Sequence, residues 1–235
     1  MSEYVIQPQE QASLEVVGSD SRYPVRRIYC VGRNYAEHAR EMGDSGREAP
    51  FFFSKPADAV LTIKDGETGN MTYPPQTSDL HHETELVVAL GSGGVNLTVE
   101  QAEKAIWGYA IGLDMTRRDL QGAAKAKGRP WETGKAFEQS APIGPLHPVA
   151  TTGVLEKGSI TLAVNGQERQ KGDLSDMIWS VAESIAHLST LFELKAGDLI
   201  FTGTPSGVAA VVPGDELLAS VEGLGQLKVK IAPAA

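Results

Sequence analysis

Three acidic residues have types and spacing that suit the chemistry of a metal ion. Glu83 and Glu85 stand two apart in the apolar run ETELVVAL, which predicts a strand over residues 83–90. Side chains alternate between the two faces of a strand, so both carboxylates point the same way, with Cα atoms about 6.6 Å apart. Asp114 ends a second apolar run, residues 107–114, just before a predicted helix. This is a common position for a ligand at the carboxyl end of a strand.

Carboxylates that are close together and partly desolvated repel one another unless one keeps its proton or a cation lies between them. Oxygen ligands with further positions left for water and substrate suit Mg²⁺, and Mn²⁺ or Ca²⁺ would accept the same ligands. The alternative is an edge strand that presents its acids to solvent, the more common situation for a pair of glutamates. Val87 and Ala89 continue the face of Glu83 and Glu85, which favours a partly buried metal site.

Arg118 and Gln121 follow on a helix predicted over residues 117–127, with Thr116 as the expected N-cap. Their spacing of three puts both side chains on one face of that helix. A guanidinium and an amide beside a metal would bind a carboxylate and a keto oxygen. The alternative is a surface helix with a solvated network of arginine and aspartate.

His38 and Glu41 share one face of a short helix predicted over residues 34–42. The carboxylate can orient the imidazole and raise its basicity, which leaves the other ring nitrogen free to activate water. By spacing alone, a surface ion pair is the preferred interpretation.

Other polar and aromatic residues allow simpler interpretations. His81 and His82 could bind zinc, but His82 falls on the face opposite the glutamates, so we expect structural roles for both. Lys55 either faces the cleft or only caps its strand. Trp131 and Trp179 are interpreted as core or loop anchors rather than stacking platforms.

The elements that must position these residues are mostly strands, because 25 glycines and 13 prolines divide the chain into short apolar runs. Residues 1–24 are polar and predict an extended arm, and residues 25–235 predict a single α+β domain. A loop is expected up to residue 79. Further strands are predicted at residues 27–31, 50–54, 160–164, 199–202, 216–221 and 226–231, and helices at residues 99–105 and 175–191.

Composition excludes several classes of protein. The formal net charge of −9 and the lack of a basic cluster argue against binding to nucleic acid or an anionic membrane. Cys30 is the only cysteine, which indicates a reducing compartment. With neither a signal peptide nor an apolar run of membrane-spanning length, we expect a cytoplasmic protein.

Beyond these separate features, the chain resembles the fumarylacetoacetate hydrolase family. The similarity extends over residues 27–231, nearly the whole chain apart from the N-terminal arm. It is carried in order by the segments GRNYAEHAREMG, FFFSKP, LHHETEL, GLDMTRRDLQ, GRPWETGKAF, SAPIGP and FTGTPSGV. The resemblance implies the fold of the family's C-terminal domain, a strand-dominated α+β fold built as a mixed β-sandwich roll with a few short helices. It also implies a homodimer.

The resemblance further implies a role for each residue that matches a family motif. Glu83, Glu85 and Asp114 would bind the metal, and Lys135 would lie beside it. Arg118, Gln121 and Thr204 would bind the substrate, with Thr204 touching its carboxylate. His38 and Glu41 match a catalytic His–Glu pair on a lid helix.

The activity implied is metal-dependent hydrolysis of a carbon–carbon bond in a 2,4-dioxo acid. Fumarylpyruvate is the expected substrate, giving fumarate and pyruvate in aromatic catabolism of the gentisate type. Its far carboxylate would meet Arg33 or Arg40. Two alternatives stay open: a decarboxylase or isomerase of oxo-diacids such as oxaloacetate, which would use the same metal and enolate, and a non-catalytic protein that binds metal or ligand.

Overall fold

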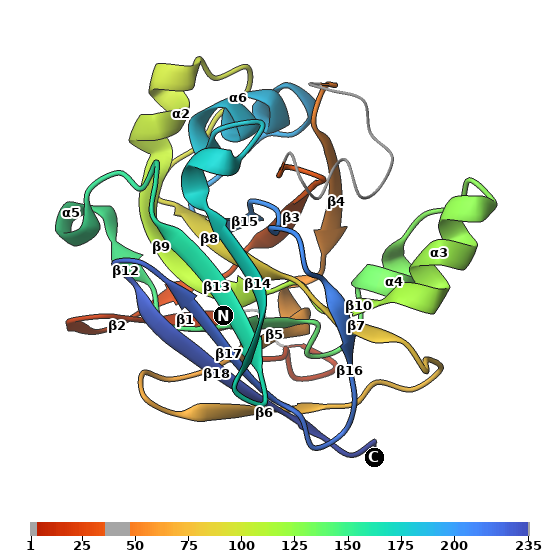
Figure 1. Cartoon of the computed structure of the whole chain (residues 1–235). Coiled ribbons are helices and arrows are strands. Elements are labelled where there is room, and N and C mark those ends of the chain that lie inside the picture. Colours follow the sequence, from red (N-terminus) through yellow and green to blue (C-terminus); the bar gives the residue numbers. More distant parts are fainter. Residues whose placement is uncertain (1–3, 36–47, 235) are drawn as a thin grey trace.

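Two β-sheets packed face to face form the core of the chain in a computed structural model that describes residues 4–35 and 48–234 (Figure 1). The strands of the larger sheet are β3 (Arg27–Gly32), β4 (Phe51–Lys55), β5 (Val60–Thr62), β8 (Thr84–Leu90), β9 (Ile106–Leu113), β11 (Ala141–Ile143), β12 (His147–Pro148) and β15 (Asp198–Phe201). Seven of them follow the order β4-β3-β15-β8-β9-β11-β5, and β12 pairs with β9. The sheet is mixed, because β15 runs parallel to β3 and β11 runs parallel to β5.

The smaller sheet alternates buried and more exposed residues. Its strands are β6 (Thr68–Thr72), β13 (Ser159–Val164), β14 (Gln167–Asp173), β17 (Glu216–Val221) and β18 (Gly225–Ala232). They follow the order β14-β13-β17-β18-β6. One face is apolar and the other polar, as expected for a sheet that covers a core on one side.

The central strands β8 and β9 are buried along almost their whole length because each face of the larger sheet has its own core. Leu86 and Val88 of β8 belong to the cluster between the two sheets, together with Leu162 of β13. Val87 and Ala89 belong to a second cluster on the opposite face. Strands buried on both faces read as continuous apolar runs, which is why residues 83–90 predicted a strand so clearly.

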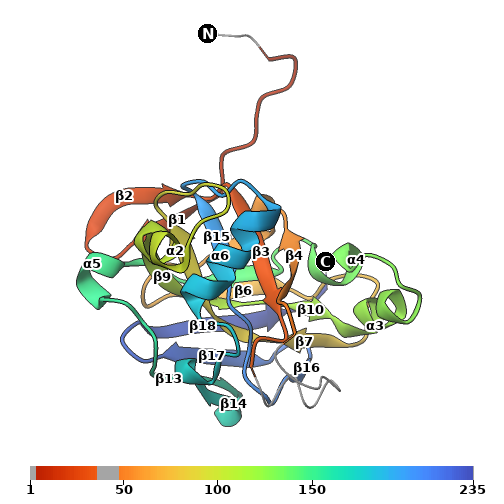
Figure 2. The same cartoon turned by 90° about the horizontal axis from the view of Figure 1, so that it is seen from above.

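A hairpin covers the second cluster. The prediction of an extended arm over residues 1–24 was therefore wrong for residues 13–24. β1 (Ser13–Val16) and β2 (Ser19–Pro24) pair antiparallel, and Leu14 and Tyr23 are buried in that cluster. Residues 4–10 lead away from the body of the chain (Figure 2). The strands are too short and too polar to stand out in the sequence, but Leu14 and Tyr23, together with hydrogen bonds between Glu15 and Val17 and the backbone of Leu146, attach the hairpin to the sheet.

Three short strands form a separate small sheet beside the site. They are β7 (Leu80–His82), β10 (Thr116–Arg117) and β16 (Ala209–Val211), in the order β10-β7-β16. β7 leads directly toward β8, and β10 follows shortly after β9. Pairing of β7 with β10 therefore brings the start of one long strand close to the end of the other.

The helices are short, as predicted. They are α2 (Val99–Ala105), α3 (Arg118–Ala126), α4 (Glu132–Lys135), α5 (Val149–Thr152) and α6 (Val181–Leu191), with 3₁₀ turns η1 (Ala57–Ala59) and η2 (Leu174–Asp176). α2 and α6 lie side by side in both views (Figures 1 and 2). No helix in the described part of the chain is long and apolar enough to cross a membrane.

Two predictions about helices were wrong. The helix predicted over residues 175–191 begins only after Ser180, whose hydroxyl accepts from the N–H of Glu183 in a capping box. Thr116 does not cap α3, because its hydroxyl bonds Glu83 and the carbonyl of Asp114 instead. The predicted loop up to residue 79 also contains β5 and β6.

Candidate active site

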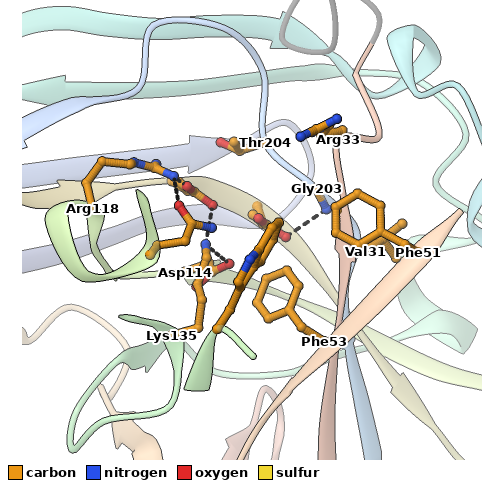
Figure 3. Close-up of a pocket in the computed structure, with 14 residues that line it drawn as sticks. Val31, Arg33, Phe51, Phe53, Asp114, Arg118, Lys135, Gly203 and Thr204 are labelled. Carbon is orange, nitrogen blue, oxygen red and sulfur yellow. Dashed lines mark hydrogen bonds and ion pairs between the residues drawn. The ribbon is translucent and has the colours of Figure 1, made fainter. Parts of the chain in front are cut away.

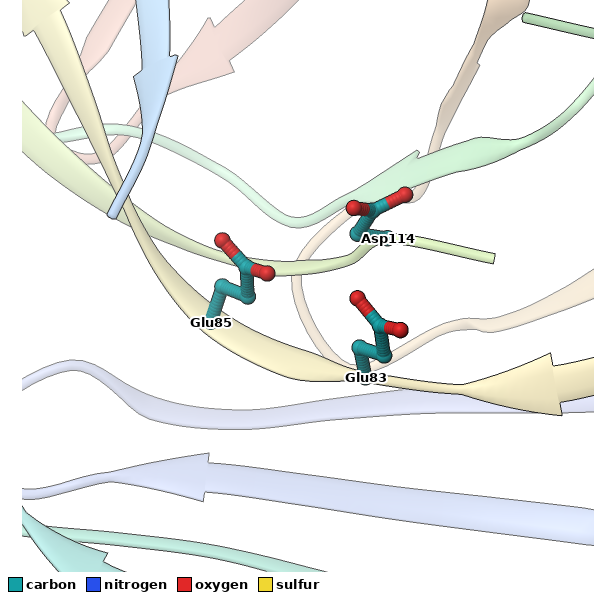
Figure 4. A group of neighbouring side chains, drawn as sticks. All are labelled: Glu83, Glu85 and Asp114. Atoms are coloured by element: carbon teal, nitrogen blue, oxygen red, sulfur yellow. The ribbon is translucent and has the colours of Figure 1, made fainter. Parts of the chain in front are cut away.

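The three acidic residues predicted as metal ligands converge (Figure 4). One carboxylate oxygen of each of Glu83, Glu85 and Asp114 lies within 4.8 Å of the others, and all three residues are buried. Glu83 lies between β7 and β8, Glu85 is in β8, and Asp114 follows β9. The N–H of Asp114 donates to the carbonyl of Glu83 at 2.8 Å, which holds the two strand ends together.

Lysines and an arginine compensate part of this negative charge. Lys135 Nζ lies 2.8 Å from Glu83 Oε2 and 2.7 Å from Asp114 Oδ2. Lys55 Nζ lies 2.8 Å from Asp114 Oδ1, an ion pair without the geometry of a hydrogen bond. Arg118 forms an ion pair with Glu83.

Glu85 is compensated differently from the other two acids. Its Oε2 accepts the N–H of Gly203 at 2.7 Å, and no side-chain cation forms an ion pair with it among the described residues. Burial, and then the charges of Asp114 and Glu83, raise the pKa of Glu85 well above its usual range. Burial also raises the pKa of Glu83, but Lys135 and Arg118 outweigh it and hold that pKa below its ordinary value. Of the three acids, Glu85 is therefore the one whose negative charge is least compensated.

The residues present fit a divalent cation. An all-oxygen set of carboxylates is the donor type that Mg²⁺ and Mn²⁺ prefer. One carboxylate oxygen of each acid already lies within 4.8 Å of the others, so Glu83, Glu85 and Asp114 would hold the ion once their side chains close on it. A cation there would also relieve the repulsion that raises the pKa of Glu85.

Helices α3 and α4 carry the other predicted site residues. Arg118 Nη1 donates to Gln121 Oε1 at 2.6 Å, so the guanidinium and the amide lie together beside Glu83. α4 packs closely on α3, because a Cβ on Gly134 would come within 2.8 Å of the Gln121 nitrogen. This close approach brings Lys135 into the cleft. Burial lowers the pKa of Lys135, but Asp114 and Glu83 outweigh it and raise that pKa, which keeps the ammonium charged.

Thr204 borders the cleft on a loop after β15. Its hydroxyl donates to the carbonyl of Thr84 at 2.7 Å and accepts from Gln170 Nε2 at 2.7 Å. Gly203 has a φ of +99°, and a Cβ there would lie 2.8 Å from the Cβ of Asn34. Glycine is therefore required at position 203 for the loop to present its N–H to Glu85.

Aromatic residues line the rest of the open cleft. Phe51, Phe53 and Trp131 are among them, with the Phe51 ring edge-on to Trp131 at a centroid distance of 5.5 Å. Figure 3 shows Phe51 and Phe53 opposite Arg118 and Lys135. The sequence interpretation of Trp131 as an anchor missed this position. The sequence FFF predicted a strand, and side-chain alternation in that strand could have predicted that Phe51 and Phe53 share one face.

Of the remaining predicted site residues, only Arg33 lies in the described part of the chain. Arg33 borders the cleft, with its Cζ 5.8 Å from the centroid of the Phe51 ring. His38, Glu41 and Arg40 lie outside the described residues, as does most of the helix predicted over residues 34–42.

His81 and His82 have polar partners outside the carboxylate group. His81 bonds Asp79 at 2.8 Å through Nε2 and contacts Arg118 through Nδ1 at 3.4 Å. His82 is buried and bonds Gln170. Neither belongs to the group formed by Glu83, Glu85 and Asp114. Lys55 does not line the cleft; it lies beneath the carboxylates and also bonds the carbonyls of Met115 and Lys135.

A strand-rich α+β fold in which buried acids and lysines meet beneath an open aromatic cleft is typical of an enzyme that acts on small molecules, and the acids are of the donor type that suits a divalent metal. Residues 27–232 match the sequence model of the fumarylacetoacetate (FAA) hydrolase C-terminal region. The chain belongs to this family, and the fold class predicted from the sequence is confirmed.

Three relatives illustrate the similarity. The crystal structure of a fumarylpyruvate hydrolase from Pseudomonas aeruginosa in complex with Mn²⁺ and pyruvate is 53% identical, with a TM-score of 0.97 over 98% of this chain and 100% of that one. A fumarylpyruvate hydrolase from Ralstonia is 46% identical over 81% of this chain and 97% of its own length. An oxaloacetate tautomerase from Escherichia coli is 42% identical over 86% of this chain and 90% of its own.

Proposed function

We propose that this chain hydrolyses fumarylpyruvate to fumarate and pyruvate with the help of Mg²⁺ or Mn²⁺. The observation that carries the proposal is the convergence of Glu83, Glu85 and Asp114 beside Lys135. The similarity to two fumarylpyruvate hydrolases, one of them bound to Mn²⁺ and pyruvate, supports this choice of substrate and metal.

In the proposed complex, Arg118 and Gln121 bind the end of the substrate that becomes pyruvate. Arg118 donates to the C1 carboxylate, and the amide of Gln121 orients the C2 keto group, in keeping with their contact at 2.6 Å. When bound by Glu83, Glu85 and Asp114, the metal would act as a Lewis acid toward the oxygens of the keto acid. The hydroxyl proton of Thr204 is directed at the Thr84 carbonyl, so Thr204 would have to turn it toward a substrate carboxylate.

The bond-breaking step needs a base and a group that stabilises negative charge. We propose that His38, oriented by Glu41, removes a proton from water whose oxygen attacks C4. The C3–C4 bond then breaks, C4 leaves as the carboxyl group of fumarate, and C3 carries the electron pair as the enolate of pyruvate. The Lys135 ammonium lies where it can hold the negative enolate oxygen before C3 takes up a proton.

The far end of the substrate is an unsaturated chain with its own carboxylate. The rings of Phe51, Phe53 and Trp131 offer an apolar wall to the unsaturated part. Arg33 borders the same cleft and is our proposed partner for the far carboxylate. The predicted homodimer and the cytoplasmic location stay predictions.

One specific observation supports a second function. The oxaloacetate tautomerase from E. coli is 42% identical, so an isomerase or decarboxylase of oxo-diacids is the alternative. Both reactions would use an enolate beside Lys135, but neither consumes water.

A single set of assays separates these functions. Purified protein is incubated with Mg²⁺ or Mn²⁺ and either fumarylpyruvate, an acylpyruvate or oxaloacetate, with and without EDTA. We expect EDTA-sensitive loss of fumarylpyruvate with release of fumarate and pyruvate. CO₂ release from oxaloacetate, or exchange between its keto and enol forms, without cleavage of fumarylpyruvate would establish the second function instead. No reaction with any substrate would indicate a binding protein.

A further inference from the structure

A buried glutamine outside the cleft connects the smaller sheet to the site. Gln170 is 0% exposed, whereas its neighbours in β14 are exposed or half-buried. Opposite β13, Leu162 pairs with Gln170 and Ala163 pairs with Glu168, so Arg169 is an extra residue that forms a β-bulge. Bulges re-aim side chains, and this one accompanies the inward turn of Gln170.

The Gln170 amide uses its full hydrogen-bonding capacity. Its Oε1 accepts from the Thr84 N–H at 3.1 Å and from His82 Nδ1 at 2.9 Å. Its Nε2 donates to Thr204 Oγ1 at 2.7 Å and to the Pro205 carbonyl at 2.8 Å. A backbone N–H can only donate and a carbonyl can only accept, so Thr84 and Pro205 fix which end of the amide is oxygen.

This polarity sets the direction of the Thr204 hydroxyl proton. Because Thr204 Oγ1 accepts from Gln170, its own proton goes to the Thr84 carbonyl. The hydroxyl keeps one lone pair, so it faces the cleft as an acceptor.

The same amide holds the loop that supports Glu85. A Cβ on Gly207 would overlap the carbonyl oxygen of Arg169, and a Cβ on Gly172 would come within 2.8 Å of the Pro205 side chain. The loop therefore lies directly against β14, with Gln170 as its polar attachment. The N–H of Gly203, in the same loop, donates to Glu85 Oε2.

We propose that Gln170 is a positioning residue that acts through the 203–207 loop on two parts of the site, the Thr204 hydroxyl and the Glu85 carboxylate. This inference depends on the proposed function in one respect, namely that Glu85 binds the metal. A glutamate at position 170 would have no N–H to donate to Thr204 or Pro205, and its carboxylate would repel the Pro205 carbonyl. Loss of a direct contact to a metal ligand typically weakens metal binding by 10- to 100-fold, and Gln170 acts one contact further away, so we expect the lower end of this range.

The test measures Mn²⁺ affinity of the substrate-free protein by calorimetry, with circular dichroism as a check of folding. We expect Gln170→Glu to weaken Mn²⁺ binding by about tenfold or more. The matched control is Gln167→Glu, the same change at an exposed position of the same strand, which should bind Mn²⁺ like the wild type. Equal affinities for Gln170→Glu and the control would overturn the proposal.

A second variant covers the case in which Gln170→Glu does not fold. Gln170→Met keeps the length of the side chain and removes its polar atoms without adding charge. It should also weaken Mn²⁺ binding, and by a smaller factor when Thr204→Val is already present, because both changes act on the same loop. Equal factors in the two backgrounds, or failure of both Gln170 variants to fold, would contradict a positioning role.

The outcome also separates this inference from the proposed substrate. A wild-type protein that binds Mn²⁺ and does not cleave fumarylpyruvate would overturn the substrate alone. One that binds no Mn²⁺ would overturn the metal site and this inference with it.

Discussion

The ammonium of Lys55 lies 2.8 Å from Oδ1 of Asp114, and both side chains are almost completely buried. Lys55 also donates to the main-chain carbonyls of Met115 and Lys135. One buried charge thus connects the segment that carries a proposed metal ligand to the helix that carries the proposed enolate-binding lysine.

Replacing this lysine should destabilise the metal-free protein. Lys55→Met leaves a buried carboxylate with one fewer cation, and breaking a buried pair typically costs about 3 kcal/mol of unfolding free energy. Because the site becomes more negative, Mn²⁺ should raise the melting temperature of the variant more than that of the wild type. Thermal unfolding with and without Mn²⁺ measures both effects. Lys104→Met, which breaks an exposed pair with Glu100, should change neither.

The two glutamates should respond in opposite directions to the same substitution. Glu83 has two cationic partners, so Glu83→Gln should lower the unfolding free energy of the metal-free protein by about 3 kcal/mol. Burial and like charge raise the pKa of Glu85, so Glu85→Gln should raise the unfolding free energy. Urea unfolding in EDTA measures this difference. Both variants should lose Mn²⁺ binding in calorimetry, and a destabilised Glu85→Gln would contradict our account of the charges.

Removal of the lysine in the cleft should slow turnover in a protein that still folds, while the loss of its ion pairs with Glu83 and Asp114 lowers the unfolding free energy. Lys135→Ala removes the cation beside the developing enolate, and the loss of one such group costs about a hundredfold in rate. Steady-state kinetics with fumarylpyruvate should show this loss in kcat, while the circular dichroism spectrum stays that of the wild type. A variant with a wild-type kcat would remove Lys135 from the mechanism.

Apolar patterning was sufficient to predict most of the long strands. Runs such as residues 83–90 and 107–114 are buried on both faces, so their sequences carry the signal directly. The shared orientation of Glu83 and Glu85 could be predicted from the sequence, because strand alternation places both on one face whatever the partner strands are. Asp114 needed only the assumption that the two strands are neighbours, which their pairing confirms.

Residues whose roles depend on distant partners could not be derived from local sequence. Thr116 is a residue type that often caps helices, but its hydroxyl instead bonds the carboxylate of Glu83, 33 residues earlier in the chain, and the carbonyl of Asp114. Lys55 reaches the site only because β4 pairs with β3 at the edge of the larger sheet. Gln170 stands in the polar run QERQKGD, where only the bulge at Arg169 distinguishes it from its exposed neighbours. The start of α6, by contrast, could have been predicted from local sequence, because Ser180 and Glu183 have the spacing of a capping box.

Stability should fall in mild acid partly because of His147. Burial lowers the pKa of His147, with Asp65 and the Leu224 carbonyl partly opposing it. In the unfolded chain the pKa returns to about 6.5, so below that pH the unfolded state binds more protons than the folded state. The stability is therefore complete above pH 6.5 and declines as the pH falls toward the folded pKa. Urea midpoints at pH 7.5 and 5.5 should differ less for His147→Gln than for the wild type, and equal differences would rule out this contribution.

The far carboxylate of the substrate gives a test of Arg33 that is independent of the chemical step. Arg33→Met should raise KM for fumarylpyruvate by about tenfold or more, since a hydrogen bond to a charged group contributes about 1.5–3 kcal/mol. Acetylpyruvate has the same dioxo-acid end without the second carboxylate, so its KM should not change. Arginine and methionine are both non-glycine residues, so the positive φ of +54° at this position affects both alike. Arg22→Met in the exposed part of the hairpin serves as the control for loss of one positive charge. A parallel rise in KM for both substrates would assign Arg33 to the shape of the cleft rather than to recognition of the second carboxylate.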